Sequence, residues 1–175
     1  MYSVGDYVVY GDSDVCQVTD IGVPNMKFHQ STGKTYYFLE TQFYKGVIYA
    51  PTDTQVAMRP VIGREDALHL IESMPSIESS ICLSSDRKKL SEHYDALMDT
   101  HSCQALARTA KSIFEKYHVP GAKAKLPNST EASYYKKASE LLLQELSVSL
   151  GEPIEAVQKR IEQVVSPGTT MKWSL

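Results

Sequence analysis

Residues 4–22, VGDYVVYGDSDVCQVTDIG, contain two short runs rich in β-branched and aromatic side chains, at residues 6–10 and 15–21. The turn-forming residues Gly11-Asp12-Ser13-Asp14 stand between these runs. Strand-forming residues on both sides of such a turn are typical of two neighbouring β-strands. The sequence therefore predicts that the chain begins as a β-sheet.

Three further runs with strand character follow before residue 63, at Lys34–Phe43, Gly46–Ala50 and Gln55–Val61. Pro51 and Pro60 should lie at strand ends or on edge strands, because proline has no N–H to donate to a neighbouring strand. Five short strands in about 60 residues predict a small Tudor-like or SH3-like β-barrel.

The hydrophobic period changes after Gly63 from that of a strand to that of a helix. Ala67, Leu70, Ile71 and Met74 have the i, i+3, i+4, i+7 spacing of one helix face. Similar stripes further on predict a compact bundle of five helices. We therefore expect an α+β chain of two modules, with a barrel at residues 1–62, an all-α bundle at 63–166 and a flexible tail at 167–175.

Two loops interrupt the predicted bundle. A serine-rich connector covers residues 77–85, in which Ser84 or Ser85 is available to cap the next helix, and a second loop runs from Val119 to Pro127. Loops with few buried contacts open readily, so we expect proteases to cut first near these two segments. Asn128-Ser-Thr-Glu131 resembles a capping box that begins the following helix.

The composition is that of an ordinary globular protein, with 42% hydrophobic and 22% charged residues. No apolar run approaches the roughly 18 residues needed to cross a bilayer, and no secretory signal is evident, so we expect a cytoplasmic protein without a membrane partner. Cys16, Cys82 and Cys103 have no disulfide or zinc-site spacing. Because no nucleophile, phosphate-loop or metal-binding motif occurs either, the sequence predicts no catalytic residue, metal, cofactor or enzyme activity.

Charge is distributed unevenly along the chain. Residues 103–137 have seven basic side chains against Glu115 and Glu131, a net charge of +5 on a chain whose net charge is −3. A local basic patch on an acidic protein favours nucleic-acid binding, although a solvated helical surface without a partner gives the same pattern. The basic residues are Arg108, Lys111, Lys116, Lys123, Lys125, Lys136 and Lys137.

The opening segment resembles the start of the CarD/CdnL family of bacterial RNA polymerase-binding transcription regulators. The segments TGKTYYFLE (residues 32–40) and VAMRPVIGREDAL (56–68) continue the resemblance, and the helical half has the matching order and length. Transcription-repair coupling factors share the first module alone. A chain of 175 residues without a helicase motif favours the CarD-like interpretation.

The resemblance implies that the β-module docks on the β-subunit lobe of RNA polymerase. In the family this docking is largely strand pairing, in which backbone hydrogen bonds give affinity and side chains give register. The matching surface here should involve residues 34–41 and 46–50, with Thr35, Tyr37, Val47 and Tyr49 as polymerase-binding residues. Tyr49 stands where some relatives have an arginine that contributes to docking.

The resemblance also implies that the helical module meets promoter DNA upstream of the −10 element and modulates open-complex stability. Family members hold phosphates with basic side chains and place a tryptophan as a wedge at the edge of the bubble. Here Asp86 stands near the wedge position, and the only tryptophan, Trp173, is in the tail. The candidate DNA-binding residues, which would hold mainly phosphates, are Arg87, Lys88, Lys89, Arg108, Lys111, Lys136 and Lys137.

The sequence therefore predicts a CarD-like transcription regulator with the polymerase β subunit and promoter DNA as partners. The alternative is an adaptor that binds polymerase and uses its bundle to recruit another protein without contacting DNA. The sequence does not indicate an oligomeric state or whether transcription rises or falls.

Overall fold

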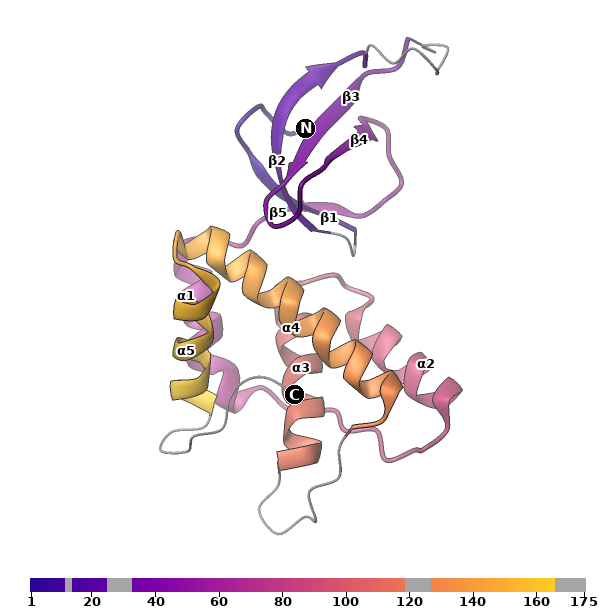
Figure 1. Cartoon of the computed structure of the whole chain (residues 1–175), viewed down its shortest axis with the longest axis vertical. Helices are drawn as coiled ribbons and strands as arrows, with labels where there is room; N and C mark the ends of the chain where they lie inside the picture. The colour runs from indigo at the N-terminus through magenta and orange to yellow at the C-terminus, as the bar shows by residue number, and fades with distance from the viewer. Residues whose placement is uncertain (12–13, 25–32, 119–126, 166–175) are drawn as a thin grey trace. The chain divides into compact units, whose positions relative to one another are not determined.

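The computed structural model describes residues 1–11, 14–24, 33–118 and 127–165. The chain divides into two compact units, Met1–Val61 and Ile62–Leu175. Strands form the first unit and helices the second (Figure 1). This confirms the predicted α+β organisation in two modules. The predicted tail at 167–175, with Trp173, lies outside the described residues.

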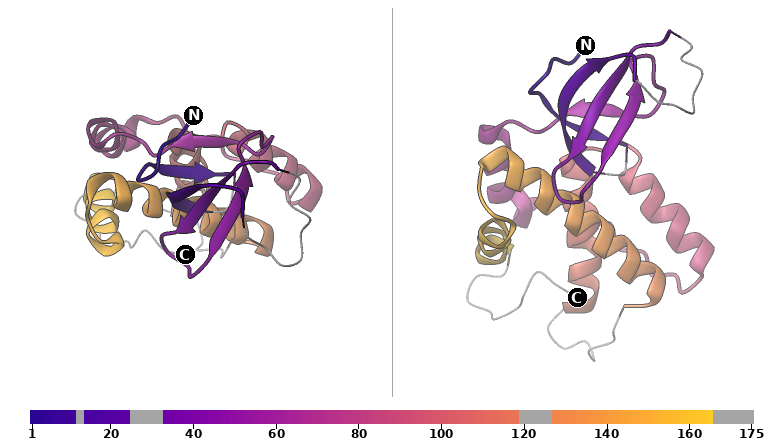
Figure 2. Two further views of the ribbon diagram at one scale, coloured as in Figure 1. Left: turned by 90° about the horizontal axis from the view of Figure 1, so that it is seen from above. Right: turned by 45° about the horizontal axis from the view of Figure 1, so that its top comes forward.

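The first unit is a five-stranded antiparallel sheet with the strand order β4-β3-β2-β1-β5. Each strand overlaps one of the five predicted runs, and the sheet is twisted (Figure 2). The described ladders leave β4 and β5 at the two ends of the sheet, and closure into a barrel stays a prediction. The strands are β1 (Tyr7–Tyr10), β2 (Asp14–Gly22), β3 (Tyr36–Thr41), β4 (Val47–Pro51) and β5 (Met58–Pro60).

One face of this sheet carries a small apolar core. Residues that alternate along a strand lie on the same face, which places Tyr37 and Leu39 of β3 on the core side together with Ala50 of β4. Val8, Cys16 and Val18 complete the buried cluster. Burial, with a smaller effect of Asp14, raises the pKa of the Cys16 thiol to about 12, so this cysteine serves as a small apolar core residue.

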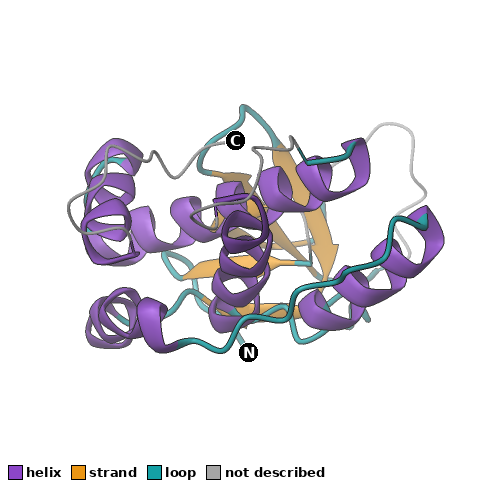
Figure 3. Ribbon diagram, turned by 90° about the horizontal axis from the view of Figure 1, so that it is seen from below, coloured by secondary structure: helices purple, strands orange, loops and turns teal. Residues whose placement is uncertain are grey.

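The second unit is built from five α-helices and one short 3₁₀ turn among the described residues (Figure 3). Each predicted hydrophobic stripe faces a common core, which includes Leu70, Tyr94, Ile113, Leu142 and Ile161. The elements are α1 (Arg64–Ser73), η1 (Met74–Ser76), α2 (Arg87–Met98), α3 (Cys103–His118), α4 (Ser129–Leu150) and α5 (Ile154–Val165).

The predicted helix cap at Asn128 is confirmed, and Glu131, three residues further on, is the centre of a buried polar network. Asn128 Oδ1 accepts the Glu131 backbone N–H at 2.9 Å. Glu131 is fully buried, and its carboxylate accepts from Lys116 Nζ at 2.7 Å, Tyr94 OH at 3.0 Å and the Tyr117 hydroxyl. Burial, followed by the neighbouring Glu131, raises the pKa of both tyrosines. The network joins three helices, because side chains of α2 and α3 all donate to the carboxylate of Glu131 on α4.

The connector between η1 and α2 is held along α3. Ser80 N–H donates to Ser112 Oγ at 2.8 Å, and Lys116 Nζ donates to the Cys82 carbonyl at 2.7 Å. The cap of α2 differs from the prediction, because Asp86 rather than Ser84 or Ser85 accepts the Lys89 N–H, at 3.0 Å. The many backbone contacts make residues 77–85 a poorer protease target than their composition predicted.

Candidate functional site

Strand β4 presents an open backbone edge. It pairs with β3 alone among the described strands. Thr41 N–H donates to the Gly46 carbonyl at 3.1 Å, and Thr52 N–H donates to the Thr35 carbonyl at 3.0 Å. These bonds fix which positions face β3, because hydrogen-bonded and non-hydrogen-bonded pairs alternate in an antiparallel ladder.

The register therefore directs the N–H and C=O groups of Val47 and Tyr49 away from β3, toward the open side of the sheet. Pro51 is the next outward position, but it has no N–H, and its carbonyl accepts from Thr54 N–H at 2.9 Å. No described residue bonds these groups, so two residues offer four backbone groups to an added strand.

The opposite edge of the sheet is closed by the chain itself. Met58 and Pro60 are the outward positions of β5. The Tyr2 hydroxyl donates to the Met58 carbonyl at 2.8 Å, and Arg59 Nη1 donates to the Pro60 carbonyl at 3.3 Å. Pro60 also lacks a donor. As predicted, both prolines lie in edge strands, each where the missing N–H would have faced outward.

The outer face at the open edge carries apolar side chains at Val47 and Tyr49, and the exposed Glu40 lies across from Val47 on the same face. The side chains of Val47 and Tyr49 are 48% and 40% exposed. Tyr49 lies across from Phe38 of β3, with ring centroids 5.0 Å apart and an edge-to-face angle of 72°. Phe38 was not among the predicted site residues, because strand register pairs it with Tyr49 and a single sequence does not display that register.

The four predicted polymerase-binding residues do not share one surface. Val47 and Tyr49 are together on the open edge. Tyr37 is on an internal strand with a buried side chain and pairs with both Ile21 and Ala50. Thr35 precedes β3, and its carbonyl is already used by Thr52. The structure therefore narrows the candidate docking edge to Val47 and Tyr49, with Phe38 behind them.

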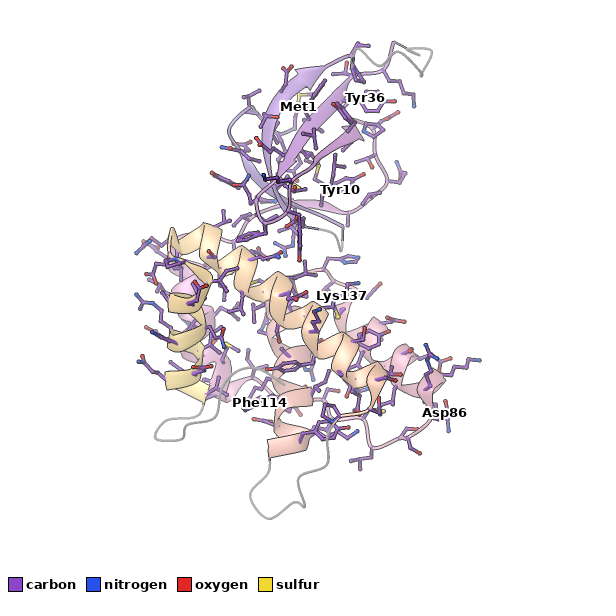
Figure 4. All side chains as sticks on the ribbon, viewed as in Figure 1. Met1, Tyr10, Tyr36, Asp86, Phe114 and Lys137 are labelled. Carbon is purple, nitrogen blue, oxygen red and sulfur yellow. The ribbon has the colours of Figure 1, made fainter. Side chains whose placement is uncertain are left out.

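Two of the predicted DNA-binding residues come together on the helical unit. Arg87 at the start of α2 and Lys137 on α4 line one groove of about 470 Å³. The hydroxyl residues Ser129 and Thr130, at the start of α4, line the same groove. It also contains Asp95, whose carboxylate accepts from Tyr134 OH at 2.5 Å. We call this the α2–α4 groove; Figure 4 labels Lys137 on α4.

Arg87, Lys88 and Lys89 form the first turn of α2, and all three are exposed. Cations are unfavourable at a helix N-terminus, where the aligned peptide dipoles already give a partial positive charge. Asp86 caps this end, and the first turn contains no acidic residue, but Glu92 lies 3.8 Å from Lys88 one turn further on. Three exposed cations therefore stand at a helix end whose Lys89 N–H already bonds a carboxylate.

The structure contradicts the prediction that Lys111 binds DNA. Its side chain is only 5% exposed, and its Nζ donates to the carbonyls of Pro75 and Ile77 at 2.9 and 2.6 Å. It also forms an ion pair with Glu115 at 3.3 Å. In this structure Lys111 fastens the end of η1 and the connector to α3 and is not available to a phosphate.

The remaining predicted cations are dispersed. Arg108 lies on a different groove, of about 790 Å³, where its Nε donates to the Glu78 carbonyl at 2.9 Å. Lys136 is exposed and close to Glu140, and Lys88 is close to Glu92, at 3.9 and 3.8 Å. Such exposed ion pairs contribute little to folding stability, and they leave both lysines accessible to solvent.

The +5 window therefore overstates the exposed charge. The ammonium groups of Lys111 and Lys116 bond partners within the helical unit, and Lys123 and Lys125 lie outside the described residues. Counting charge along the sequence does not distinguish a lysine facing solvent from one that bonds carbonyls inside the bundle. The described basic surface centres instead on the start of α2 and on α4.

Within the described ranges, no group of three or more His, Cys, Asp or Glu side chains could hold a metal ion. No described helix has the length and apolar character required to cross a membrane.

Comparison with known proteins assigns the first unit to a domain family. The family model of the CarD-like/TRCF RID domain matches residues 2–62, which contain all five strands. No curated protein matches the chain. Domains of this family are non-catalytic modules that interact with RNA polymerase. Residues 2–62 are therefore a domain of the CarD-like/TRCF RID family.

Proposed function

We propose that this protein is a transcription regulator that docks on the β-subunit lobe of RNA polymerase through β4 and holds its helical unit against promoter DNA upstream of the −10 element. Its binding there modulates the stability of the open complex. The observation that carries the proposal is the open β4 edge within a domain of the CarD-like/TRCF RID family.

The docking step is β-augmentation. An extended segment of the polymerase lobe adds to β4 and exchanges hydrogen bonds with the outward N–H and C=O groups of Val47 and Tyr49. The exposed apolar face formed by Val47, Phe38 and Tyr49 receives the side chains of that segment. Because Tyr49 replaces a charged side chain found in some relatives, docking should depend less on salt than an arginine-mediated contact does.

Proline at position 47 tests this docking mode. Val47→Pro removes one outward N–H without touching the β3–β4 ladder, whereas Val47→Ala shortens the side chain and keeps the donor. One net hydrogen bond is worth about 1 kcal/mol, so capture of the isolated polymerase lobe should weaken about fivefold for Val47→Pro relative to Val47→Ala. Circular dichroism should show equal folding. Equal capture by the two variants would refute docking through this edge.

The DNA step is phosphate binding without base readout. The cations at the start of α2, Arg87–Lys89, and Lys137 in the α2–α4 groove support it, as do the hydroxyls at the start of α4. An anion there also benefits from the positive end of the helix dipole. Lys88 and Lys136 remain in the proposed footprint, Arg108 is peripheral to it, and Lys111 is omitted because it is buried.

Charge reversal with a matched control tests the DNA step. Arg87→Glu should weaken binding to a promoter–polymerase complex and lower the salt slope by about one, similarly for different promoter sequences. Lys159→Glu makes the same change of charge at an exposed position on α5 and should leave the slope unchanged. If the two variants have the same slope, the helical unit recruits a protein rather than DNA, which is the adaptor alternative.

A further inference from the structure

The open edge of β4 is complementary to itself. In an antiparallel pair of two β4 strands related by a two-fold axis at Ile48, Val47 of one copy lies opposite Tyr49 of the other. Both residues have outward N–H and C=O groups, so each of the two opposed pairs exchanges two hydrogen bonds. This register satisfies all four outward groups of both residues in each copy.

The side chains at these positions also favour this register. Opposed residues of an antiparallel pair project from the same face of the sheet. Val47 would therefore contact Tyr49 of the second copy beside the Phe38–Tyr49 aromatic pair, and the exposed side chains at both positions are apolar. Aromatic and β-branched side chains in such cross-strand pairs attract each other. No like charges are placed opposite each other at these positions.

Other registers and other edges are less favourable. A two-fold axis at Tyr49 would place Val47 opposite Pro51, which has no N–H and whose carbonyl already accepts from Thr54. Pairing of β4 with β5 of another copy is obstructed, because Tyr2 and Arg59 occupy the outward carbonyls of Met58 and Pro60. A head-to-tail contact would build filaments, whereas two β4 strands form a closed pair.

We propose that the free protein forms a weak symmetric dimer through β4–β4 pairing, and that this dimer competes with polymerase for the same backbone groups. The competition rests on the proposed function, whereas the dimer does not. Two outward residues make a short ladder. An interface of that size buries less than the roughly 1,200 Å² of stable specific interfaces. The dimer therefore forms at high protein concentration and yields to a partner with a larger contact.

Sedimentation velocity of the full-length protein, from micromolar to millimolar concentration, tests the dimer. The sedimentation coefficient should rise with concentration for the native protein. Tyr49→Lys puts a charge on the edge and should raise the dimer dissociation constant at least about tenfold. Tyr44→Lys introduces the same charge at an exposed tyrosine in the β3–β4 turn and should leave the association unchanged. Exchange of the Val47 and Tyr49 amide protons should slow as the dimer forms.

A native protein that stays monomeric throughout this range overturns the proposal, and so does an association that Tyr49→Lys leaves unchanged. Capture of the isolated polymerase lobe by the native protein, measured in parallel, keeps the two proposals separate. Capture without dimerisation refutes the dimer alone, and dimerisation without capture refutes the polymerase assignment alone. If both occur, adding the lobe should dissociate the dimer, and a lobe bound to an intact dimer would overturn the proposed competition.

Discussion

Substitutions at Asp86 separate two effects: the loss of a helix cap, and the absence of the tryptophan wedge that the family resemblance places here. The Asp86 carboxylate accepts the Lys89 N–H at 3.0 Å and so caps α2, at the position where the family resemblance places an aromatic wedge (Figure 4). Replacing an aspartate N-cap costs about 1 kcal/mol of folding stability. Stacking of an aromatic side chain on a base is worth about 1–3 kcal/mol. Asp86→Trp should therefore lower protein stability and lengthen the lifetime of the open complex.

Three substitutions at this position distinguish the two effects. Asp86→Asn keeps the cap and removes the charge, so stability should stay within a few tenths of a kcal/mol. Asp86→Ala and Asp86→Trp both lose the cap, and their melting temperatures should fall by about 4 °C. Only Asp86→Trp adds stacking, and about 1–3 kcal/mol corresponds to an open-complex lifetime about five to 160 times that of Asp86→Ala.

The assay is the decay of heparin-resistant complexes on one promoter with the cognate polymerase, below the melting temperature of every variant. If Asp86→Trp and Asp86→Ala decay at the same rate, the start of α2 does not lie at the edge of the bubble. If Asp86→Ala melts at the native temperature, the capping bond to Lys89 is not formed in solution.

Three further predictions concern the fold. Glu131→Gln removes the fully buried carboxylate that pairs with the partly buried Lys116 and should lower the free energy of urea unfolding by about 3 kcal/mol; a loss below 1 kcal/mol would mean that water reaches this network. Burial, opposed by the hydrogen bond from Val15 N–H, raises the pKa of Asp14, so the native state binds this proton more tightly than the unfolded state does and stability falls as pH rises through the native pKa. Asp14→Asn should therefore be more stable than the native protein at pH 7, with a difference that shrinks toward pH 4 in chemical denaturation, and a constant difference would exclude Asp14 as the source. Limited proteolysis should spare residues 77–85, and early cleavage there, identified by mass spectrometry, would contradict the hydrogen bonds that hold this connector to α3.

The sequence by itself determined the order of the elements. The five strand-forming runs, the helical spacing after Gly63 and the helix cap at Asn128 are local patterns, which can be recognised without knowledge of the tertiary contacts. Gly151 is a further example, because the helix ends there in a left-handed conformation (φ 64°) that glycine adopts without strain. The opening motif likewise identified the family of the first unit, because it lies within one contiguous segment.

The sites were decided by contacts between distant segments. Tyr37 has the sequence character of a surface strand residue, yet β2 and β4 flank its strand and the core buries its ring. Lys111 and Lys116 are ordinary basic residues in the sequence, and only the path of the connector beside α3 turns them inward, toward carbonyls and Glu131.

The open edge is the clearest case of a property that only the tertiary structure decides. Whether a backbone N–H faces a neighbouring strand or solvent depends on register, and a shift of one residue exchanges the two sets. Pro51 and Pro60 marked edge strands in advance because they lack donors, but the sequence did not show that Tyr2 would cover β5 while β4 stayed open. Local chemistry thus fixes which strands form, and long-range pairing fixes which of their atoms remain available to a partner.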